Sequence, residues 1–304
     1  MPNPRHKRRS KSAVNSALIR RPIQRCFALF LLPTFAAFCI GFVYPFLKGF
    51  YLSFCKFTTT SDAQFVGLQN YVRALKDPSF IHAFGYTALV AVVSLVLINL
   101  LAFTVAYVLT RGIKGSNLFR SVFFMPNLIG GIVLGYIWKM IFNGILPMSI
   151  ELSTKYGYWG LIILMCWQQV GYMMIIYIAG LQSVPDDLIE AAQIDGASSW
   201  QTLWHITIPS VMPSITICSF LTLTNSFKLY DQNLALNGNG APILMQANGS
   251  QIRTTEMLAL NISSTFSKAN WRGVAQAKAV LFFILVAVIA LIQLRATRSK
   301  EVQR

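Results

Sequence analysis

The feature that most restricts the fold of this 304-residue sequence is a set of long apolar runs. The densest of them, 88–106, holds no charged residue over 19 consecutive positions. A helix needs roughly 20 consecutive apolar residues to cross a bilayer. Over the whole chain 55% of residues are hydrophobic and 12% are charged, whereas soluble domains carry about 25% charged residues. The sequence therefore predicts an integral membrane protein.

Six apolar runs are expected to be membrane-spanning helices, so the predicted fold is all-α. The third run is broken by Pro126 and by Gly130–Gly131, which a span tolerates where neighbouring helices cover the freed backbone groups. The first follows a basic segment, as in a signal peptide, but it is too long for a signal core and lacks a clear cleavage site. We therefore expect it to be retained. The expected spans are 26–47, 81–110, 121–141, 159–181, 213–230 and 273–294.

The distribution of basic residues predicts the orientation of these spans. The chain has 26 Lys and Arg against 10 Asp and Glu, a net charge of +16. Fifteen of the 26 lie in the segments 1–25, 111–120 and 295–304, and positive charge collects on the cytoplasmic side of a membrane. With six spans, both termini are expected in the cytoplasm: 1–25 as a basic N-terminal tail and 295–304 as a C-terminal tail. The same distribution accounts for the charge without nucleic acid.

One segment on the predicted cytoplasmic side departs from this pattern. Residues 182–212 contain four acidic residues and no Lys or Arg. Pro185 suits the start of a short helix, and Gly196 suits a left-handed turn at its end. Ser198 or Ser199 is a candidate cap for a second short helix, which Pro209 is expected to interrupt before the fifth span. The segment is thus predicted to form two short helices joined by a glycine turn.

The same segment carries the residues that resemble a known family. EAA at 190–192, Gly196 and the ending ITIP at 206–209 resemble the signature loop of permease subunits of binding-protein-dependent ABC importers. The full string, PDDLIEAAQIDGASSWQTLWHITIP, is most similar to the carbohydrate branch, which includes the maltose and glycerol-3-phosphate permeases. It departs from the pattern at Ile208, where Leu is usual, and at Trp204, where Phe is common. Further similarity covers Tyr230–Asp231, NGNGAP at 237–242, Thr254–Thr255 and RGVAQAKAV at 272–280.

The resemblance implies a function and a set of partners. It makes 26–294 a six-span permease domain, in which the loop 182–212 is a coupling helix that inserts into a separate ATPase subunit. Glu190 would pair with a basic residue there, and alternating access would follow ATP-driven closure. The implied partners are a second, different permease subunit, two ATPase subunits and an extracytoplasmic solute-binding protein that docks on 48–80 and 231–272, all at a bacterial cytoplasmic membrane. The implied coupling residues are Glu190, Ala191, Ala192, Asp195, Gly196 and Pro209.

No ATP site is expected in this chain, because the sequence contains no Gly-Lys dipeptide and so no GxxxxGK[ST] loop. ATP and Mg are expected on the ATPase subunits, with no cofactor and no catalytic site in this chain. His6, His82 and His205 are far apart in sequence and predict no metal site.

Polar residues within the fourth and fifth predicted spans are candidates for binding a sugar, because amides and hydroxyls supply its hydrogen bonds and tyrosine its stacking surface. Tyr172 lies 18 residues before Glu190, a position that looks like a sugar-contacting aromatic in maltose-type permeases. The alternative for each is a hydrogen bond between helices. Lys228 suits an anionic substrate such as a sugar phosphate, or else snorkels or pairs with Asp231. The candidates are Gln168, Gln169, Tyr172, Thr222, Asn225 and Ser226.

Other membrane functions are less consistent with the sequence. An ion-coupled secondary transporter would need a buried acidic residue, and none occurs in 27–47, 81–141 or 159–181. A membrane enzyme would need a catalytic constellation, and a channel gives no reason for the EAA segment. A requirement for a partner ATPase separates the importer from all three.

Overall fold

The computed structural model describes residues 31–245 and 251–298, and it divides into two units, 1–52 and 53–304. The described part of the first unit is one apolar helix, Leu31–Leu52. It contains a π-helical turn, η1 (Cys39–Val43), followed by α2 (Tyr44–Leu52). Phe38, Phe42 and Phe46 stack along one side at ring separations of 5.3 and 6.2 Å. The helix ends five residues after the predicted end of the first span, and 26–30 lie outside the described residues.

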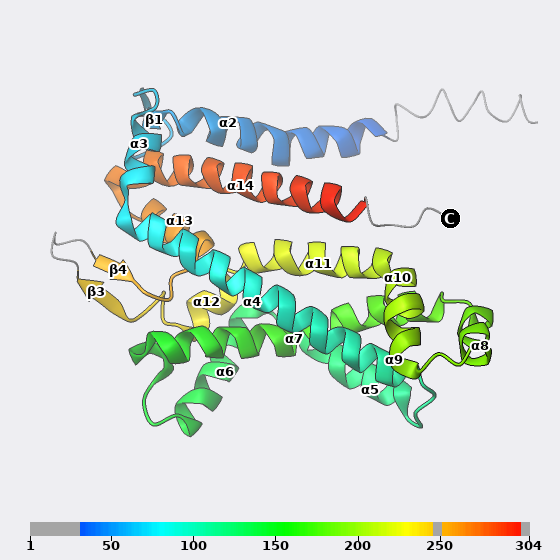
Figure 1. The fold of residues 1–304 in the computed structure, drawn as a ribbon. Helices are drawn as coiled ribbons and strands as arrows, with labels where there is room; N and C mark the ends of the chain where they lie inside the picture. The colour runs from blue at the N-terminus through cyan, green and yellow to red at the C-terminus, as the bar shows by residue number, and fades with distance from the viewer. Residues whose placement is uncertain (1–30, 246–250, 299–304) are drawn as a thin grey trace, which may run out of the picture. The chain divides into compact units, whose positions relative to one another are not determined.

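Two long helices form the frame of the second unit (Figure 1). They are α4 (Pro78–Leu109) and α7 (Thr154–Gln182), with 32 and 29 residues, which at 1.5 Å per residue span about 48 and 44 Å. Asp77 caps α4 by accepting from the Ser79 amide, and Ser153 caps α7. Both caps lie outside the apolar runs, so both helices begin earlier than the predicted spans. Apolar residues of both helices share one buried core: Val90, Ile98, Ala102, Leu161, Met165 and Met173.

The third predicted span is two helices rather than one. α5 (Ser116–Phe124) and η2 (Met125–Leu128) are bent by 103° from α6 (Gly131–Ile145). Gly171 of α7 lets the backbone at Phe123 approach so closely that a Cβ there would overlap its carbonyl. On the other side, a Cβ at Gly135 of α6 would lie 2.6 Å from Ala235 of α12 (Asp231–Leu236). The break expected from Pro126 and Gly130–Gly131 is therefore present, and packing sets its angle.

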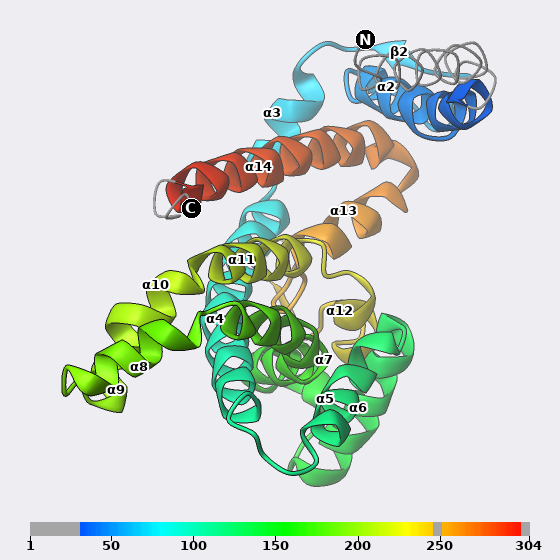
Figure 2. The same cartoon turned by 90° about the vertical axis from the view of Figure 1, so that its right-hand side faces the viewer.

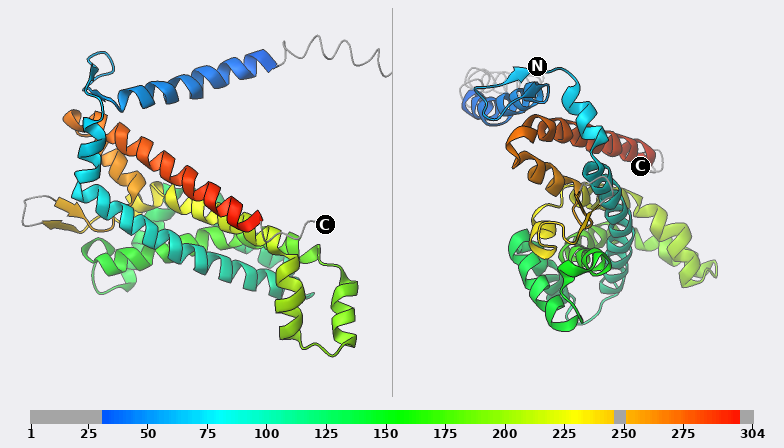
Figure 3. Two further views of the ribbon diagram at one scale, coloured as in Figure 1. Left: turned by 45° about the horizontal axis from the view of Figure 1, so that its top comes forward. Right: turned by 90° about the vertical axis from the view of Figure 1, so that its left-hand side faces the viewer.

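α4 defines two ends of this unit, which Figures 2 and 3 show from other sides. The hairpin end, where Pro78 lies, holds α3 (Gln69–Lys76), α13 (Leu258–Phe266), η5 (Ala269–Trp271) and two antiparallel strand pairs. The knob end, where Leu109 lies, holds the short helices after α7. The strand pairs are β1 (Cys55–Lys56) with β2 (Gln64–Phe65) and β3 (Ile243–Met245) with β4 (Gln251–Arg253). The expectation of an all-helical chain is corrected to this extent: the fold is mostly helical, and its loops pair as short strands.

The remaining long helices complete the bundle. α11 (Met212–Phe227) packs on α4 and α7, where Gly180 of α7 leaves room for Ser214. α14 (Arg272–Arg298) starts at the hairpin end and packs on α13, α3 and α11. A short turn, η3 (Ile150–Leu152), precedes α7, and Glu151 there pairs with Lys139 of α6. Among the described residues, four helices are long and apolar enough to cross a membrane, and the number rises to six when each bent pair counts as one span.

A buried lysine joins three elements at the hairpin end. Lys278 of α14 is fully buried. Its Nζ donates to Asp77 Oδ2 at 2.7 Å, to Asn261 Oδ1 at 2.9 Å and to Thr265 Oγ1 at 2.8 Å. A buried charge is tolerated only when it is paired and its hydrogen bonds are satisfied, and all three ammonium donors are used here. The contact ties α14 to α13 and to the start of α4.

Candidate functional site: the knob and the polar residues of α7 and α11

The first element of the knob (residues 186–210) is the short helix α8 (Asp186–Ile194). Pro185 is extended and directly precedes it, and Asp186 and Asp187 lie in its first turn, where the helix dipole favours negative charge. Gly196 has a φ of +78°. Its amide donates to Gln193 O at 3.1 Å, and the Ala197 amide donates to Ala192 O at 2.9 Å. This pair of bonds is a Schellman motif, so the glycine both ends α8 and reverses the chain.

The second element runs back toward the bundle through α9 (Ser199–Thr202), the π-turn η4 (Leu203–Thr207) and α10 (Ile208–Ser210). Ser198 caps it in a reciprocal capping box with Gln201. The prediction that Pro209 interrupts this helix is wrong by two residues. Pro209 lies in α10 directly after the π-turn η4, and Ser199–Ser210 forms one helical segment. The chain bends instead at Val211, by 69°, before α11 begins.

The knob exposes acidic and apolar side chains together. Glu190, Ala191, Asp195, Gly196 and Pro209 are exposed, whereas Ala192 is buried. Apolar residues share this exposure, above all Ile194, whose exposed fraction is 87%. Such an apolar surface is unusual for a free face and typical of a protein contact. The other large exposed apolar residues are Leu188, Trp200 and Trp204, the last two with ring centroids 5.6 Å apart.

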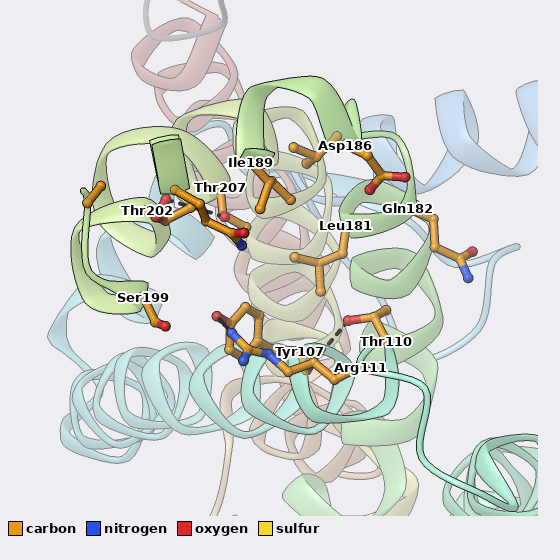
Figure 4. A pocket seen from close by; sticks show the side chains of 13 residues that line it. Tyr107, Thr110, Arg111, Leu181, Gln182, Asp186, Ile189, Ser199, Thr202 and Thr207 are labelled. Carbon is orange, nitrogen blue, oxygen red and sulfur yellow. Dashed lines mark hydrogen bonds between the residues drawn. The ribbon is translucent and has the colours of Figure 1, made fainter. Parts of the chain in front are cut away.

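A pocket of about 550 Å³ lies behind α8 (Figure 4). Its floor is the end of α4, where the Arg111 guanidinium lies 4.4 Å from the centre of the Tyr107 ring and donates to the Tyr107 hydroxyl. Asp186 and Ile189 of α8 form the opposite wall. The knob is therefore joined to α7 and α11 through the chain and is separated from the end of α4 by open space.

The structure does not bring the six sugar candidates into one group. Gln168, midway along α7, accepts from Gln232 Nε2 at 2.9 Å and donates to Ile129 O at 3.5 Å. It thereby covers the carbonyl at the break before α6 and holds α12 in place. Gln169 is buried, and its Oε1 has no hydrogen-bond partner among the described residues. Tyr172 is half-buried against the core, and Asn225 is exposed.

Thr222 and Ser226 lie in a helix interface. Both are fully buried. Thr222 Oγ1 accepts from Asn99 Nδ2 at 3.4 Å, Asn99 Oδ1 accepts from the Tyr177 hydroxyl at 2.7 Å, and Ser226 donates to the Thr222 carbonyl at 2.8 Å. The bonds of Asn99 are the interhelical contacts that stood as the alternative to sugar binding. Sequence reasoning missed Asn99, Tyr177 and Gln232, although an asparagine inside the densest apolar run was a visible signal.

Lys228 and the two described histidines take no part in these hydrogen bonds. Lys228 is exposed and forms no ion pair with Asp231 within the described ranges. His82 Nε2 lies 3.0 Å from Thr254 O, and His205 Nδ1 lies 3.0 Å from Gln201 O. His6 lies outside the described residues.

Comparison with known proteins places this architecture in a family. Residues 98–300 match the family described as binding-protein-dependent transport system inner membrane component. The chain is 40% identical over 286 residues to the "Probable starch degradation products transport system permease protein AmyD" of Thermoanaerobacterium thermosulfurigenes, covering 90% of this chain and 94% of that protein. It is 31% identical to the "Multiple sugar-binding transport system permease protein MsmF" of Streptococcus mutans serotype c, covering 86% and 92%.

A solved structure shares the fold. A chain of a bacterial ABC transporter involved in the import of the acidic polysaccharide alginate superimposes with a TM-score of 0.73 at 19% identity, covering 92% of this chain and 98% of that one. The family match over two thirds of the sequence, the full-length relatives and this shared architecture lead to one conclusion: the chain belongs to the family of binding-protein-dependent transport system inner membrane components.

Proposed function

We propose that this chain is a permease subunit of an ATP-driven ABC importer that moves sugars or oligosaccharides delivered by an extracytoplasmic solute-binding protein. The family membership and the sugar-transport names of its full-length relatives support this assignment. The chain itself supplies the membrane path, and ATP and Mg are handled by separate ATPase subunits. A second, homologous permease subunit completes the path.

The observation that carries the proposal is the construction of the knob. α8 is short, acidic and exposed, and its orientation is fixed by the Schellman turn at Gly196 and the capping box at Ser198. It is joined to α7 by three residues and, through α9, η4 and α10, to α11. A force applied to α8 therefore reaches two spanning helices directly. A partner that binds α8 and changes shape on binding ATP would move both, which is alternating access by domain movement.

The charges of the knob define the partner surface. Residues 182–212 carry four carboxylates and no Lys or Arg, so a basic cleft on the ATPase subunit matches them. Glu190 is exposed near the centre of α8 and is the proposed partner of a basic residue there. This role assigns the knob end to the cytoplasm, in agreement with the basic loop that contains Arg111 and Lys114 at the same end.

Among the sugar candidates, the residues with unused polar atoms are the stronger proposals. Gln169 has a buried, unpartnered carbonyl oxygen among the described residues, and Tyr172 lies one turn away on the same helix. Gln168, whose amide already bonds Gln232 and Ile129 O, and the exposed Asn225 complete the proposed set. Thr222 already bonds Asn99 of α4, and the buried Ser226 donates to the Thr222 carbonyl within α11. The exposed Lys228 keeps a sugar phosphate as the alternative substrate.

The decisive experiment is uptake and ATPase activity of the reconstituted complex. Glu190→Ala and Gly196→Ala are each compared with wild type. The matched control is Gly112→Ala, since Gly112 also has a positive φ, of +76°, and open space around it but lies outside the knob. We expect both knob variants to insert in the membrane and lose ATP-dependent uptake, while the control retains it. Uptake that survives both knob variants, or that needs no ATPase subunit, would overturn the importer assignment.

A further inference from the structure

A second pocket lies at the hairpin end, at the opposite end of α4 from the knob. Its volume is about 830 Å³. Pro78, the first residue of α4, lines it, whereas Thr110, just past the other end of α4, lines the knob pocket. The helix between them is about 48 Å long, more than the roughly 30 Å of a bilayer core. The charged residues that line this second pocket, here called the basic pocket, are Arg73, Lys76, Asp77, Arg253, Glu256 and Lys268.

The acidic residues of the basic pocket are already neutralised. Asp77 Oδ2 accepts from the buried Lys278 at 2.7 Å, and Asp77 Oδ1 accepts from the Ser79 amide at 3.0 Å. Glu256 accepts from Asn261 Nδ2 at 2.8 Å and from Ser264 Oγ at 2.7 Å, and it lies 3.7 Å from Arg253 Nη1. Both carboxylates are therefore satisfied by groups of this chain.

Three of the four basic residues of the same pocket are not neutralised. Arg73, Lys76 and Lys268 form no ion pair with any described residue. The segment 246–250, which precedes Gln251 of the pocket in the sequence and lies outside the described residues, contains no acidic residue, since its sequence is QANGS. Three cations on α3 and at the end of α13 therefore face one hollow without a counter-charge. Such a site attracts anionic groups over a distance and orders them on contact.

The wall of the basic pocket is held in place by contacts that reach across the sequence. Ser79 Oγ donates to Gln251 O at 2.8 Å, which fixes β4 to the start of α4. His82 Nε2 lies 3.0 Å from Thr254 O. Lys278 of α14 donates to Asn261 of α13, which lines the pocket. Ser263, Ser264 and Ser267 also line the hollow, but the Ser264 hydroxyl already donates to Glu256 and the Ser267 hydroxyl to Ser263 O. Basic side chains that project from an anchored backbone are the chemistry that binds a carboxylate.

We infer that the basic pocket is a docking socket for acidic side chains of the extracytoplasmic solute-binding protein. The inference rests on the proposed function, since it places the hairpin end outside the cell. A folded protein that carries several Asp or Glu side chains on one surface matches both the volume and the three unpaired cations. The socket would steer the loaded binding protein to this end of the permease and set its orientation there.

The test uses the full transporter complex in phosphatidylcholine nanodiscs and the solute-binding protein that supports its uptake. Affinity is measured for wild type and for Lys76→Glu and Lys268→Glu over a series of salt concentrations. The matched control is Lys155→Glu, because Lys155 is exposed at the hairpin end of α7 but does not line the pocket. We expect each pocket variant to weaken binding about tenfold at low salt, with the difference shrinking as salt screens the charges. The control is expected to change less than about twofold.

Zero-length coupling of amines to carboxylates gives an independent readout. With a carbodiimide, Lys76 and Lys268 should couple to Asp or Glu of the docked binding protein, whereas Lys155 should not. Reversing the identified acidic residue to Lys should restore affinity for the Lys268→Glu complex. Lys76→Gln and Lys268→Gln, which remove the charge without reversing it, should give intermediate affinities.

Each remaining outcome of these measurements counts against the socket. Equal weakening by Lys155→Glu, or no weakening by the pocket variants, would overturn the inference while leaving the transporter intact. In a further outcome, the effect of Lys76→Glu and Lys268→Glu on affinity disappears in phosphatidylcholine nanodiscs and returns only when phosphatidylglycerol is added. That result would assign the pocket to lipid headgroups and would also overturn the inference. Failure of the proposed function looks different, since the wild-type complex would then show no uptake that depends on a binding protein.

Discussion

Lys278 Nζ lies 2.7 Å from Asp77 Oδ2, although the two residues are 201 positions apart in the chain. Lys278 is fully buried, and Asp77 is largely buried. Asp77 also caps α4, so one carboxylate both caps one long apolar helix and neutralises the charge inside another. We regard this contact as the joint that holds α14 to the start of α4 at the hairpin end.

The first prediction concerns that joint. Lys278→Met leaves Asp77 with an unpaired, largely buried charge, which costs about 3–5 kcal/mol. The double variant Lys278→Met/Asp77→Asn removes both charges and keeps a capping side chain, so it should recover part of the loss. Unfolding of the purified protein in detergent, measured for wild type, both single variants and the double variant, gives the coupling energy. Additive losses would show that the two residues do not act as a pair.

The second prediction concerns the close approach of α5 to α7. A Cβ at Gly171 would overlap the carbonyl of Phe123, which is backbone and has no rotamer to change. Gly171→Ala should therefore destabilise the fold by roughly 1–3 kcal/mol or more. The matched control is Gly144→Ala in α6, where nothing lies within 4 Å of the added Cβ. Thermal unfolding in one detergent compares the two, and equal Tm values would contradict the close contact between Gly171 and Phe123.

The third prediction separates packing residues from sugar contacts. Tyr177→Phe removes the hydroxyl that donates to Asn99, and such bonds between membrane helices are worth about 0.6 kcal/mol on average and at most about 1.7. We expect lower stability and an unchanged KM for transport. Tyr172→Phe, which keeps the ring packed against the core, should do the reverse, with a raised KM and little change in stability. A raised KM in Tyr177→Phe would instead place the Asn99 cluster on the substrate path.

The fourth prediction concerns the exposed face of the knob. Trp200 and Trp204 are 66% and 51% exposed, side by side. If the ATPase subunit covers this face, their fluorescence should shift to shorter wavelength when the subunit binds. Trp200→Phe should remove part of the shift, whereas Trp159→Phe, at the hairpin end of α7, should leave it unchanged. An identical shift in all three proteins would show that the ATPase does not contact this face.

The features that the sequence by itself determined are the ones that local chemistry decides. Apolar runs of spanning length predict membrane helices, because length and composition are properties of a contiguous segment. The reversal at Gly196 and a serine cap at Ser198 or Ser199 were likewise predictable, since each depends on hydrogen bonds within six residues, and the structure selects Ser198. The break around Pro126 and Gly130–Gly131 was visible for the same reason.

Tertiary structure decided what no local pattern contains. The 103° angle between α5 and α6 follows from how Gly171 and Gly135 admit neighbouring segments. Two sugar candidates, Gln168 and Thr222, have partners in Gln232 and Asn99 that lie far away in the sequence.

The partner of Lys278 and the unpaired cations of the basic pocket have the same origin, because helix packing brings distant segments to one end of the bundle. The physical reason is that a polar group inside a membrane protein must find its partner in space. That partner is set by the packing of the helices rather than by its distance along the chain.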